Sequence, residues 1–405
     1  MMTSAPEVHI CIVSDQLLAN IIPALMRRPQ HVHLLTSERM HEQAERLKRF
    51  LEARGIPATL HPDMPDHDVA KIAAWMSGQL EAIVLDTNPA LLLNATGGTK
   101  LMTLALFRVL EKNLGRLGEV IYTDTANYCL ERLQADGDEA PEPMREVLHV
   151  PDLLEAGGMT YRSASSDDAD WRAAADERKS LSKLLGKGQP ALGQLIGQLN
   201  RSASEAIEKR GREERLAHPG QHLKLAARGE RAKAEREVLE LAESCGLIDR
   251  DEADAGRIWF RSVDAARYLG GLWLEEYVWH IARDAGFADV RAGVEITWQG
   301  TAKRDAQRNE FDLLIAHRNR LLTIECKTAN FNGRAGAEAQ HITSKLDSLG
   351  KHAGGAFSSE LLISARELTR ELHSRCQSLR IKVIQTGQLA NLRSTFQNWD
   401  DADSS

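Results

Sequence analysis

Short apolar runs alternate with amphipathic stretches over the first third of the chain. Buried strands are predicted at 8–14, 31–37, 57–61, 91–96, 119–125 and 128–134. Helices are predicted between them, at 17–27, 38–54, from about 66, and at 100–112. Because strands that alternate with helices build parallel sheets, we expect a doubly wound α/β domain, and the last two runs lie close enough together for a terminal hairpin.

The pattern changes after residue 150. Residues 137–178 are rich in Asp, Glu, Ala, Ser, Gly and Pro and predict a linker, whereas 179–243 are mostly helical and 236–264 resemble a winged helix. A second α/β pattern then begins, with helices at 265–285, 337–352, 366–377 and the C-terminus, and strands at 288–298, 310–317, 320–328, 360–364 and 380–385. We therefore predict domains at 1–150 and 265–405, joined by a linker and a basic helical, winged-helix-like segment at 151–264.

Composition agrees with a globular protein of two or three domains. The 405 residues are 42% hydrophobic and 27% charged. No apolar run approaches the ~20 residues that span a bilayer, and no secretory signal is visible at 1–6. The five cysteines are scattered without a CxxC pair, which predicts neither a disulfide framework nor a zinc site, so a reducing cytoplasm is expected.

Charge is distributed unevenly along the chain. The net charge is −7, but residues 176–236 hold 14 Lys and Arg against 8 Asp and Glu. This local excess would attract a polyanion such as nucleic acid. The alternative is a solvated helical face without a partner.

Candidate chemistry is concentrated in the segment NEFDLLI at 309–315, followed after a short turn by LLTIECK at 321–327. Two strands joined in this way form a hairpin, and side chains alternate between its faces. Glu325 and Lys327 then share one face, and hairpin pairing can place Asp312 beside them, while Phe311 and Leu313 face away from Asp312. The helix before carries Glu275 and Glu276 in LGGLWLEEYVW, and of these two carboxylates we favour Glu275.

Polar groups that converge between apolar strands need a partner, because unpaired buried charge is costly. Carboxylates of Asp312 and Glu325, a backbone carbonyl at Cys326 and waters suit Mg²⁺ or Mn²⁺. Such a site predicts hydrolysis of a phosphodiester, with Lys327 orienting the water or stabilising the transition state. The alternative is a structural cluster of ion pairs.

The series GLWLEEY, NEFD and ECK resembles the PD-(D/E)xK nuclease signature, with Phe311 where the family's proline stands. The resemblance implies a restriction-endonuclease-like domain, with Asp312, Glu325, Lys327 and Glu275 as catalytic residues.

A second set of polar turns follows the N-terminal strands. Residues 94–100, Asn94, Ala95, Thr96, Gly97, Gly98, Thr99 and Lys100, lie between a strand and a helix, where glycines and a helix N-terminus favour phosphate. With Ser14, Asp15 and Gln16 after the first strand and Thr36 and Ser37 after the second, they resemble the CRISPR-associated Rossmann fold, the CARF domain. Parallel sheets bind ligands at these strand ends.

The two resemblances together are similar to the CARF-fused ancillary nucleases of type III CRISPR systems. They imply a homodimer that binds one cyclic oligoadenylate, most simply cyclic tetra-adenylate, and cleaves DNA, RNA or both when it is bound. Two alternatives stay open: a sensor whose C-terminal domain binds nucleic acid or a partner without cleaving it, and an enzyme whose CARF domain degrades its own activator.

Overall fold

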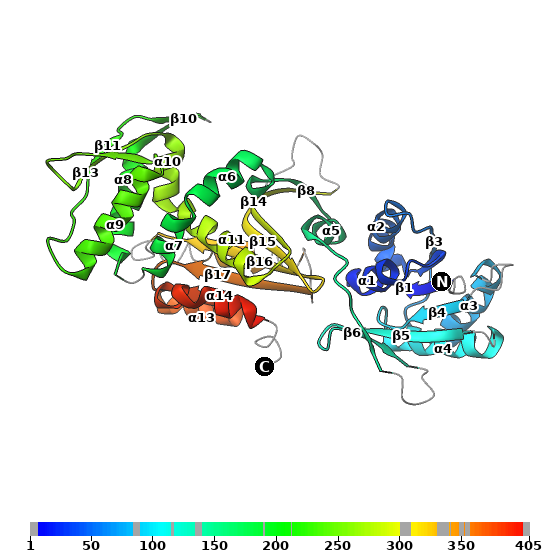
Figure 1. Cartoon of the computed structure of the whole chain (residues 1–405). Helices are drawn as coiled ribbons and strands as arrows, with labels where there is room; N and C mark the ends of the chain where they lie inside the picture. Colours follow the sequence, from blue (N-terminus) through cyan, green and yellow to red (C-terminus); the bar gives the residue numbers. More distant parts are fainter. Residues whose placement is uncertain are drawn as a thin grey trace, which may run out of the picture.

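The computed structural model describes residues 7–83, 90–114, 117–133, 140–188, 191–211, 213–299, 309–329, 340, 342–347, 352 and 357–399. Within these ranges two large sheets, each with its own helices, are joined by α5 and the chain that precedes it (Figure 1). No helix in these ranges is both long and apolar enough to cross a membrane.

The N-terminal sheet has the predicted doubly wound form. Its elements are β1 (Glu7–Ile12), α1 (Leu18–Arg27), β2 (His31–Leu35), η1 (Glu38–Met40), α2 (His41–Glu52), β3 (Ala58–His61), α3 (Val69–Ile83), β4 (Ala90–Asn94), α4 (Lys100–Leu114), β5 (Leu117–Asp124), β6 (Cys129–Arg132) and β7 (Glu142–Pro143). The strand order is β3-β2-β1-β4-β5-β6-β7, with the first five strands parallel and the last two antiparallel. The predicted terminal hairpin is therefore confirmed. Alternate β1 side chains enter two cores, one shared with α1 and α2 and the other with α3 and α4.

The prediction of a linker across 137–178 is wrong for the residues described there. They form β7, α5 (Val150–Ala156), β8 (Met159–Ala164), η2 (Ser165–Asp167) and α6 (Ala169–Glu177). The strand β8 pairs with β14 (Asp289–Trp298), so the second sheet begins well before the predicted boundary at 264/265. Local composition did not indicate this, because the partner of β8 lies some 130 residues further along the chain.

The middle segment contains helices and small sheets, so the prediction that 179–243 is mostly helical is wrong at 207–210, 213–216 and 220–222, where strands lie. It contains α7 (Lys179–Lys187), α8 (Gly193–Ala206), a hairpin of β9 (Ile207–Arg210) and β10 (Glu213–Leu216), β11 (Gly220–His222), α9 (Glu230–Ser244), β12 (Ile248–Arg250), β13 (Arg257–Phe260) and α10 (Val263–Arg267). A three-stranded sheet, β11-β13-β12, lies beside α9 in the manner of a winged helix.

The C-terminal sheet has the order β18-β17-β16-β15-β14-β8. Its further elements are η3 (Tyr268–Leu272), α11 (Trp273–Ala285), β15 (Asn309–His317), β16 (Arg320–Lys327), β17 (Ser358–Ser364), α13 (Arg370–Ser378), β18 (Lys382–Gln385), η5 (Thr386–Asn391) and α14 (Leu392–Gln397). The helix predicted at 337–352 is seen at 342–347, and most of its other residues lie outside the described ranges.

The two faces of this sheet meet different partners. Leu313, Leu322 and Ile324 belong to a core that includes residues of α7, α8, α11 and α14. Leu314 and Leu321 point the other way, into a core that continues through α5 into α1 and α2 of the N-terminal domain. The back of the β14–β16 region therefore packs on α5, which in turn contacts α2 of the N-terminal domain.

The strict alternation assumed from sequence fails at one point. Leu313 and its partner Ala292 lie in the first core, whereas Phe311 and its partner Val294 lie in the second. Gly293, with φ +60°, lies between the two partners in β14, and the register skips both Gly293 and Asp312. Phe311 and Leu313 therefore do not share a face, and the pleat changes sides at Asp312, as at many strand irregularities beside functional sites.

Candidate active site and ligand-binding turns

The β15–β16 hairpin brings together the three residues expected from its sequence. Lys327 Nζ lies 2.6 Å from Glu325 Oε1 and 3.8 Å from Asp312 Oδ2. The backbone amide of Cys326 donates to Asp312 Oδ2 at 2.7 Å, which fixes the orientation of that carboxylate. The Cys326 thiol is buried beside the cluster, and burial followed by the charges of Asp312 and Glu275 raises its pKa, which keeps it a neutral thiol.

The fourth expected residue comes from α11. The charges of Asp312, Glu310, Lys327 and Glu325 all act on Glu275, so it belongs to the same cluster. Its neighbour Glu276 points away and pairs with Arg178, whose Nε lies 3.2 Å from Glu276 Oε2. The structure therefore separates the two candidates and brings Glu275, the one favoured from sequence, to the hairpin.

The helix reaches the hairpin through a single π-helical turn, η3, of a kind often found at functional sites. A Cβ at Gly270 would lie 2.7 Å from Ala203 Cβ, and one at Gly271 would lie 2.8 Å from Thr328 Oγ1. The two glycines therefore allow η3 to lie against α8 and the end of β16, and this approach places Glu275 at the cluster.

The cluster carries more negative charge than its lysines balance. Burial, followed by the charges of Asp312 and Glu310, raises the pKa of Glu275 well above its usual value. Burial and the Glu325 charge raise the pKa of Asp312 to about 6. Burial opposes the ionisation of Glu325 as well, but Lys327 and Lys345 outweigh it and lower the pKa of that carboxyl.

Two residues of the cluster were missed by the sequence analysis. Lys345 Nζ lies 3.0 Å from Glu325 Oε2, so Glu325 is held between two lysines. Glu310 contributes a further charge near Glu275. The alternation of β15 could have indicated Glu310, two residues before Asp312, but nothing local connects Lys345 with a strand some twenty residues earlier.

A cleft of about 660 Å³ opens on the cluster. It is lined by Glu275, Glu310, Cys326 and Lys327, together with residues of α8, β9, β10 and η3. The basic side chains of Lys209 and Arg267 line it as well. The middle segment before α11 thus lines part of the cleft, next to the residues that are expected to be catalytic.

The second set of expected residues lies at one edge of the N-terminal sheet. The turns after β2, β1 and β4 are neighbours, because these three strands are adjacent and parallel. Asp15, Gln16, Gly98, Thr99 and Lys100 are exposed there, and Ser14 is half-buried. The helix α4 begins at Lys100, so its N-terminus faces the same edge, where an anion is stabilised.

Three of the expected ligand contacts have structural partners instead. Asn94 is fully buried, and its amide donates to Ala19 O and Asn20 Oδ1. Thr36 is also buried, and its hydroxyl donates to Ser37 O. Thr96 joins Asn94 Oδ1 to the backbone amide of Thr123, through its own hydroxyl. These side chains hold the turns in place, which favours a supporting role over direct contact with a ligand.

Packing against β1 explains why glycine stands at both Gly97 and Gly98. A Cβ at Gly97 would lie 2.0 Å from Ile12 O, and Gly98 has φ +76° with Ile12 Cγ2 2.5 Å from an added Cβ. The turn therefore lies against β1 in a way that only glycine permits.

A hollow of about 390 Å³ adjoins this edge, lined by Ser37, Glu38, Arg39 and the loop 63–66. The hydroxyl of Thr99 reaches Asp66 O at 3.5 Å, which connects the glycine turn to that loop. Of the lining residues only Ser37 was expected from sequence, since a loop after a short edge strand gives no pattern of its own.

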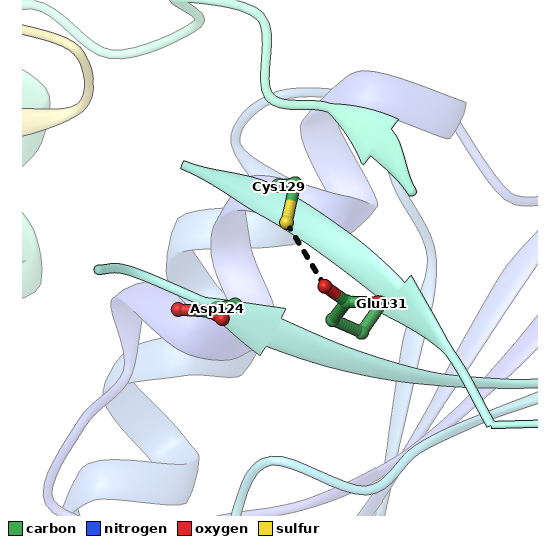
Figure 2. Close-up of side chains that lie close together, drawn as sticks. All are labelled: Asp124, Cys129 and Glu131. Atoms are coloured by element: carbon green, nitrogen blue, oxygen red, sulfur yellow. Dashed lines mark hydrogen bonds between the residues drawn. The ribbon is translucent and has the colours of Figure 1, made fainter. Parts of the chain in front are cut away.

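Asp124, Cys129 and Glu131 form a further polar group at the β5–β6 turn (Figure 2). Asp124 Oδ1 accepts from the amides of Ala126 and Asn127, and the Cys129 thiol donates to Glu131 at 3.5 Å. These bonds describe a braced turn, and burial and Glu131 raise the pKa of Cys129 to about 11, away from the thiolate that binds metals.

An N-terminal Rossmann-like sensor domain followed by a restriction-endonuclease-like domain is the class that this fold and these sites define. Comparison with family models agrees: residues 8–152 match the Card1 CARF domain, and residues 262–403 match the Card1-like endonuclease domain. The chain therefore belongs to the nucleases that join a Card1-type CARF domain to a Card1-like endonuclease domain. A search of curated proteins finds no match.

Two solved structures resemble the whole chain. Can2 from Sulfobacillus thermosulfidooxidans, solved in complex with cyclic tetra-adenylate, is 25% identical, with a TM-score of 0.73 and 97% of both chains covered. The protein VC1899 from Vibrio cholerae is 18% identical, with a TM-score of 0.78 and 98% of both chains covered, and shows the same fold.

Proposed function

We propose that the chain is a metal-dependent nuclease that cleaves DNA, RNA or both, and that a cyclic oligoadenylate activates it through the CARF domain. The observation that supports nuclease activity is the cluster of Asp312, Glu325 and Glu275 around Lys327 in an open cleft. A purely structural network of ion pairs would balance its charges, and this cluster does not.

The donors fit a hard divalent cation. Glu275 and Asp312 are half-buried carboxylates, and burial together with neighbouring acidic groups raises their pKa values, which supports a cation as their partner. Their oxygens, with Glu325 and the Cys326 carbonyl, are the ligand types that Mg²⁺ and Mn²⁺ prefer. When bound, such a cation neutralises charge on the scissile phosphate and lowers the pKa of a coordinated water.

The chain's own groups then divide the remaining work. The Cys326 amide holds the Asp312 carboxylate in one orientation. Lys327 lies at the cleft and can hold the attacking water or the phosphate oxygen in place. Lys345, which holds Glu325 from its other oxygen, is proposed as a second positive charge near the scissile phosphate. Lys209 and Arg267, which pair with Glu214 in the same cleft, would exchange that partner for flanking phosphates and bind them without reading sequence.

The proposed activator rests on the CARF domain and on the Can2 relative. The exposed turns Ser14–Gln16 and Gly97–Lys100 offer backbone amides, hydroxyls and one lysine at the N-terminus of α4. We propose cyclic tetra-adenylate as the ligand and a homodimer as the acting form, because a ring with two-fold symmetry suits two identical turns across an axis. Action in the cytoplasm is part of the same proposal.

The experiment incubates the purified protein with RNA, single-stranded DNA and supercoiled duplex DNA, with and without cyclic tetra-adenylate and Mn²⁺ or Mg²⁺. We expect cleavage of at least one substrate only when the messenger and a divalent cation are both present. Binding of nucleic acid without cleavage would favour a sensor that only binds its partner. Following the messenger by chromatography in the same reactions shows whether the CARF domain degrades it.

A further inference from the structure

The turn between β15 and β16 is an unusual hairpin end. Arg318 and Asn319 both have left-handed backbones, with φ +50° and +57°, as a two-residue type I′ turn requires. Hairpin tips normally face water, but Asn319 is completely buried. This tip belongs to the hairpin that carries Asp312, Glu325 and Lys327, so whatever holds it also positions the proposed catalytic groups.

Asn319 uses its whole amide group to bind the chain that leaves the N-terminal domain. Its Oδ1 accepts from the amides of Val147 at 2.8 Å and Leu148 at 3.2 Å. Its Nδ2 donates to Arg145 O at 2.8 Å. Three bonds to one backbone segment, made by a fully buried side chain, hold the tip more firmly than a surface ion pair would.

The residues on either side of Asn319 reach further into the N-terminal domain. The Arg320 guanidinium donates to Thr125 O at 2.6 Å, and the Arg318 guanidinium lies 5.3 Å from the centroid of the Tyr128 ring. Thr125 and Tyr128 belong to the β5–β6 turn that Asp124 braces (Figure 2). The hairpin tip therefore contacts a rigid feature of the CARF sheet rather than a loose loop.

The same CARF turn is joined to the proposed messenger site. The amide of Thr123 donates to the Thr96 hydroxyl at 2.7 Å, and Thr96 directly precedes Gly97 and Gly98. A change in the glycine turn thus acts on β5 one residue before Asp124, and β5 ends at the turn that contacts Arg318 and Arg320. Hydrogen bonds and the end of β5 therefore connect the glycine turn to the hairpin tip.

We propose that the Arg318–Arg320 tip is a coupling contact, through which the CARF domain sets the position of the catalytic hairpin when it binds the messenger. This inference rests on the proposed function, because it needs a messenger that activates cleavage. A contact that only holds the two domains together would contribute to the free energy of unfolding. A coupling contact also changes the ratio of the cleavage rates with and without messenger.

Two substitutions separate these roles. Asn319→Gly keeps a left-handed backbone and removes the three bonds to the 145–148 segment. Arg318→Gly relieves a left-handed arginine and removes its contact with Tyr128, so it leaves the melting temperature unchanged or raises it. Arg380→Gly is the matched control, since Arg380 is an exposed left-handed residue in the turn before β18 of the same sheet.

The test measures cleavage rates at saturating cyclic tetra-adenylate and without it, messenger affinity and melting temperature for each variant. We expect the activation ratio to fall about tenfold or more for Asn319→Gly, within the roughly 5–150-fold range of allosteric coupling. For Arg318→Gly we expect a smaller fall, with no loss of melting temperature, and for Arg380→Gly no change in the ratio.

Three results decide the matter. If both tip variants keep the wild-type activation ratio, the coupling contact is excluded while the proposed function stands. If Asn319→Gly fails to fold, Arg318→Gly alone decides, and an unchanged ratio there overturns the inference. If the wild-type protein shows no activation by the messenger at all, the proposed function fails first and the coupling contact fails with it.

Discussion

The nuclease cluster and the ligand-binding edge of the CARF domain are built from different kinds of groups. The nuclease cluster consists of charged side chains, most of them half-buried, whose negative charges exceed the lysines that face them. The CARF edge consists of backbone, glycine and short polar side chains on an exposed turn, with its buried members bonded to the chain's own carbonyls. A site that performs hydrolysis must hold charge that the folded chain alone does not compensate, whereas a site that senses a ligand needs only a shape that the ligand completes.

The largest effect should come from removing groups of the cluster. Glu325→Ala or Lys327→Ala is expected to lower cleavage by about 100-fold or more, the scale seen when preorganised electrostatic groups are lost. Messenger binding should be unchanged, because both residues lie in the other domain. Cleavage assays and titration of the messenger check this, with the exposed Lys233→Ala on α9 as control. A near wild-type rate for either cluster variant would show that the active site has been misassigned.

The two neighbouring glutamates of α11 sharpen the same contrast. Glu275→Gln should lower cleavage at least about tenfold, as loss of groups around a metal commonly does. Glu276→Gln should leave the rate largely intact, because Glu276 points away from the cluster and pairs with Arg178. Rates and thermal unfolding of both variants decide. The reverse result would mean that Glu276, rather than Glu275, belongs to the site.

On the sensor side a single charge reversal is informative. Lys100→Glu should weaken messenger binding about 10–100-fold, the scale of losing a hydrogen bond to a charged group. Activation should then require correspondingly more messenger, while the cluster remains intact. Lys112→Glu, an exposed lysine at the other end of α4, is the control. Unchanged affinity and activation in Lys100→Glu would remove this turn from the messenger site.

The smallest expected effect concerns stability in the absence of metal. Because the pKa of Asp312 is raised to about 6, its folded form holds a proton more tightly than its unfolded form. The protonated Asp312 carboxyl therefore stabilises the fold below about pH 4, and this stabilisation is lost as pH rises toward 6. In EDTA at pH 8, Asp312→Asn should therefore raise stability by about 1–3 kcal/mol, which corresponds to a gain of several degrees in Tm.

Asp284 provides the opposite sign as a control. Burial acts against its ionisation, but Lys183 and Lys179 lower its pKa to about 2, so its charged form supports the fold above about pH 4. Asp284→Asn should lower Tm at pH 8. If Asp312→Asn and Asp284→Asn shift Tm in the same direction, the charge imbalance attributed to the cluster is incorrect.

Sequence patterns predicted the local elements well, because a buried strand or an amphipathic helix is recorded in its own residues. They placed Asp312, Glu325 and Lys327 on one hairpin and favoured Glu275 over Glu276, and the structure brings these four together. What they missed depends on distant partners. The strand β8 is recognisable only beside β14, and Lys345 reaches Glu325 only through the packing of its helix.

Two further differences show the limits of local rules. Asn94 follows a strand in the way that ligand-binding residues do, yet it satisfies buried carbonyl and amide groups of α1. The pleat reverses at Asp312 because Gly293 on the neighbouring strand adopts a left-handed backbone, which the sequence of β15 does not record. The residue roles within both sites remain predictions that the substitutions above test.

The central claim is that one messenger and one cation together switch on cleavage by the C-terminal cluster. The most direct measurement compares the wild-type protein with Lys327→Ala on a labelled nucleic acid, with cyclic tetra-adenylate, and with Mn²⁺ or excess EDTA. The account predicts cleavage only by the wild-type protein, only with the messenger and only with the cation. Equal cleavage in excess EDTA, or by Lys327→Ala, would contradict it.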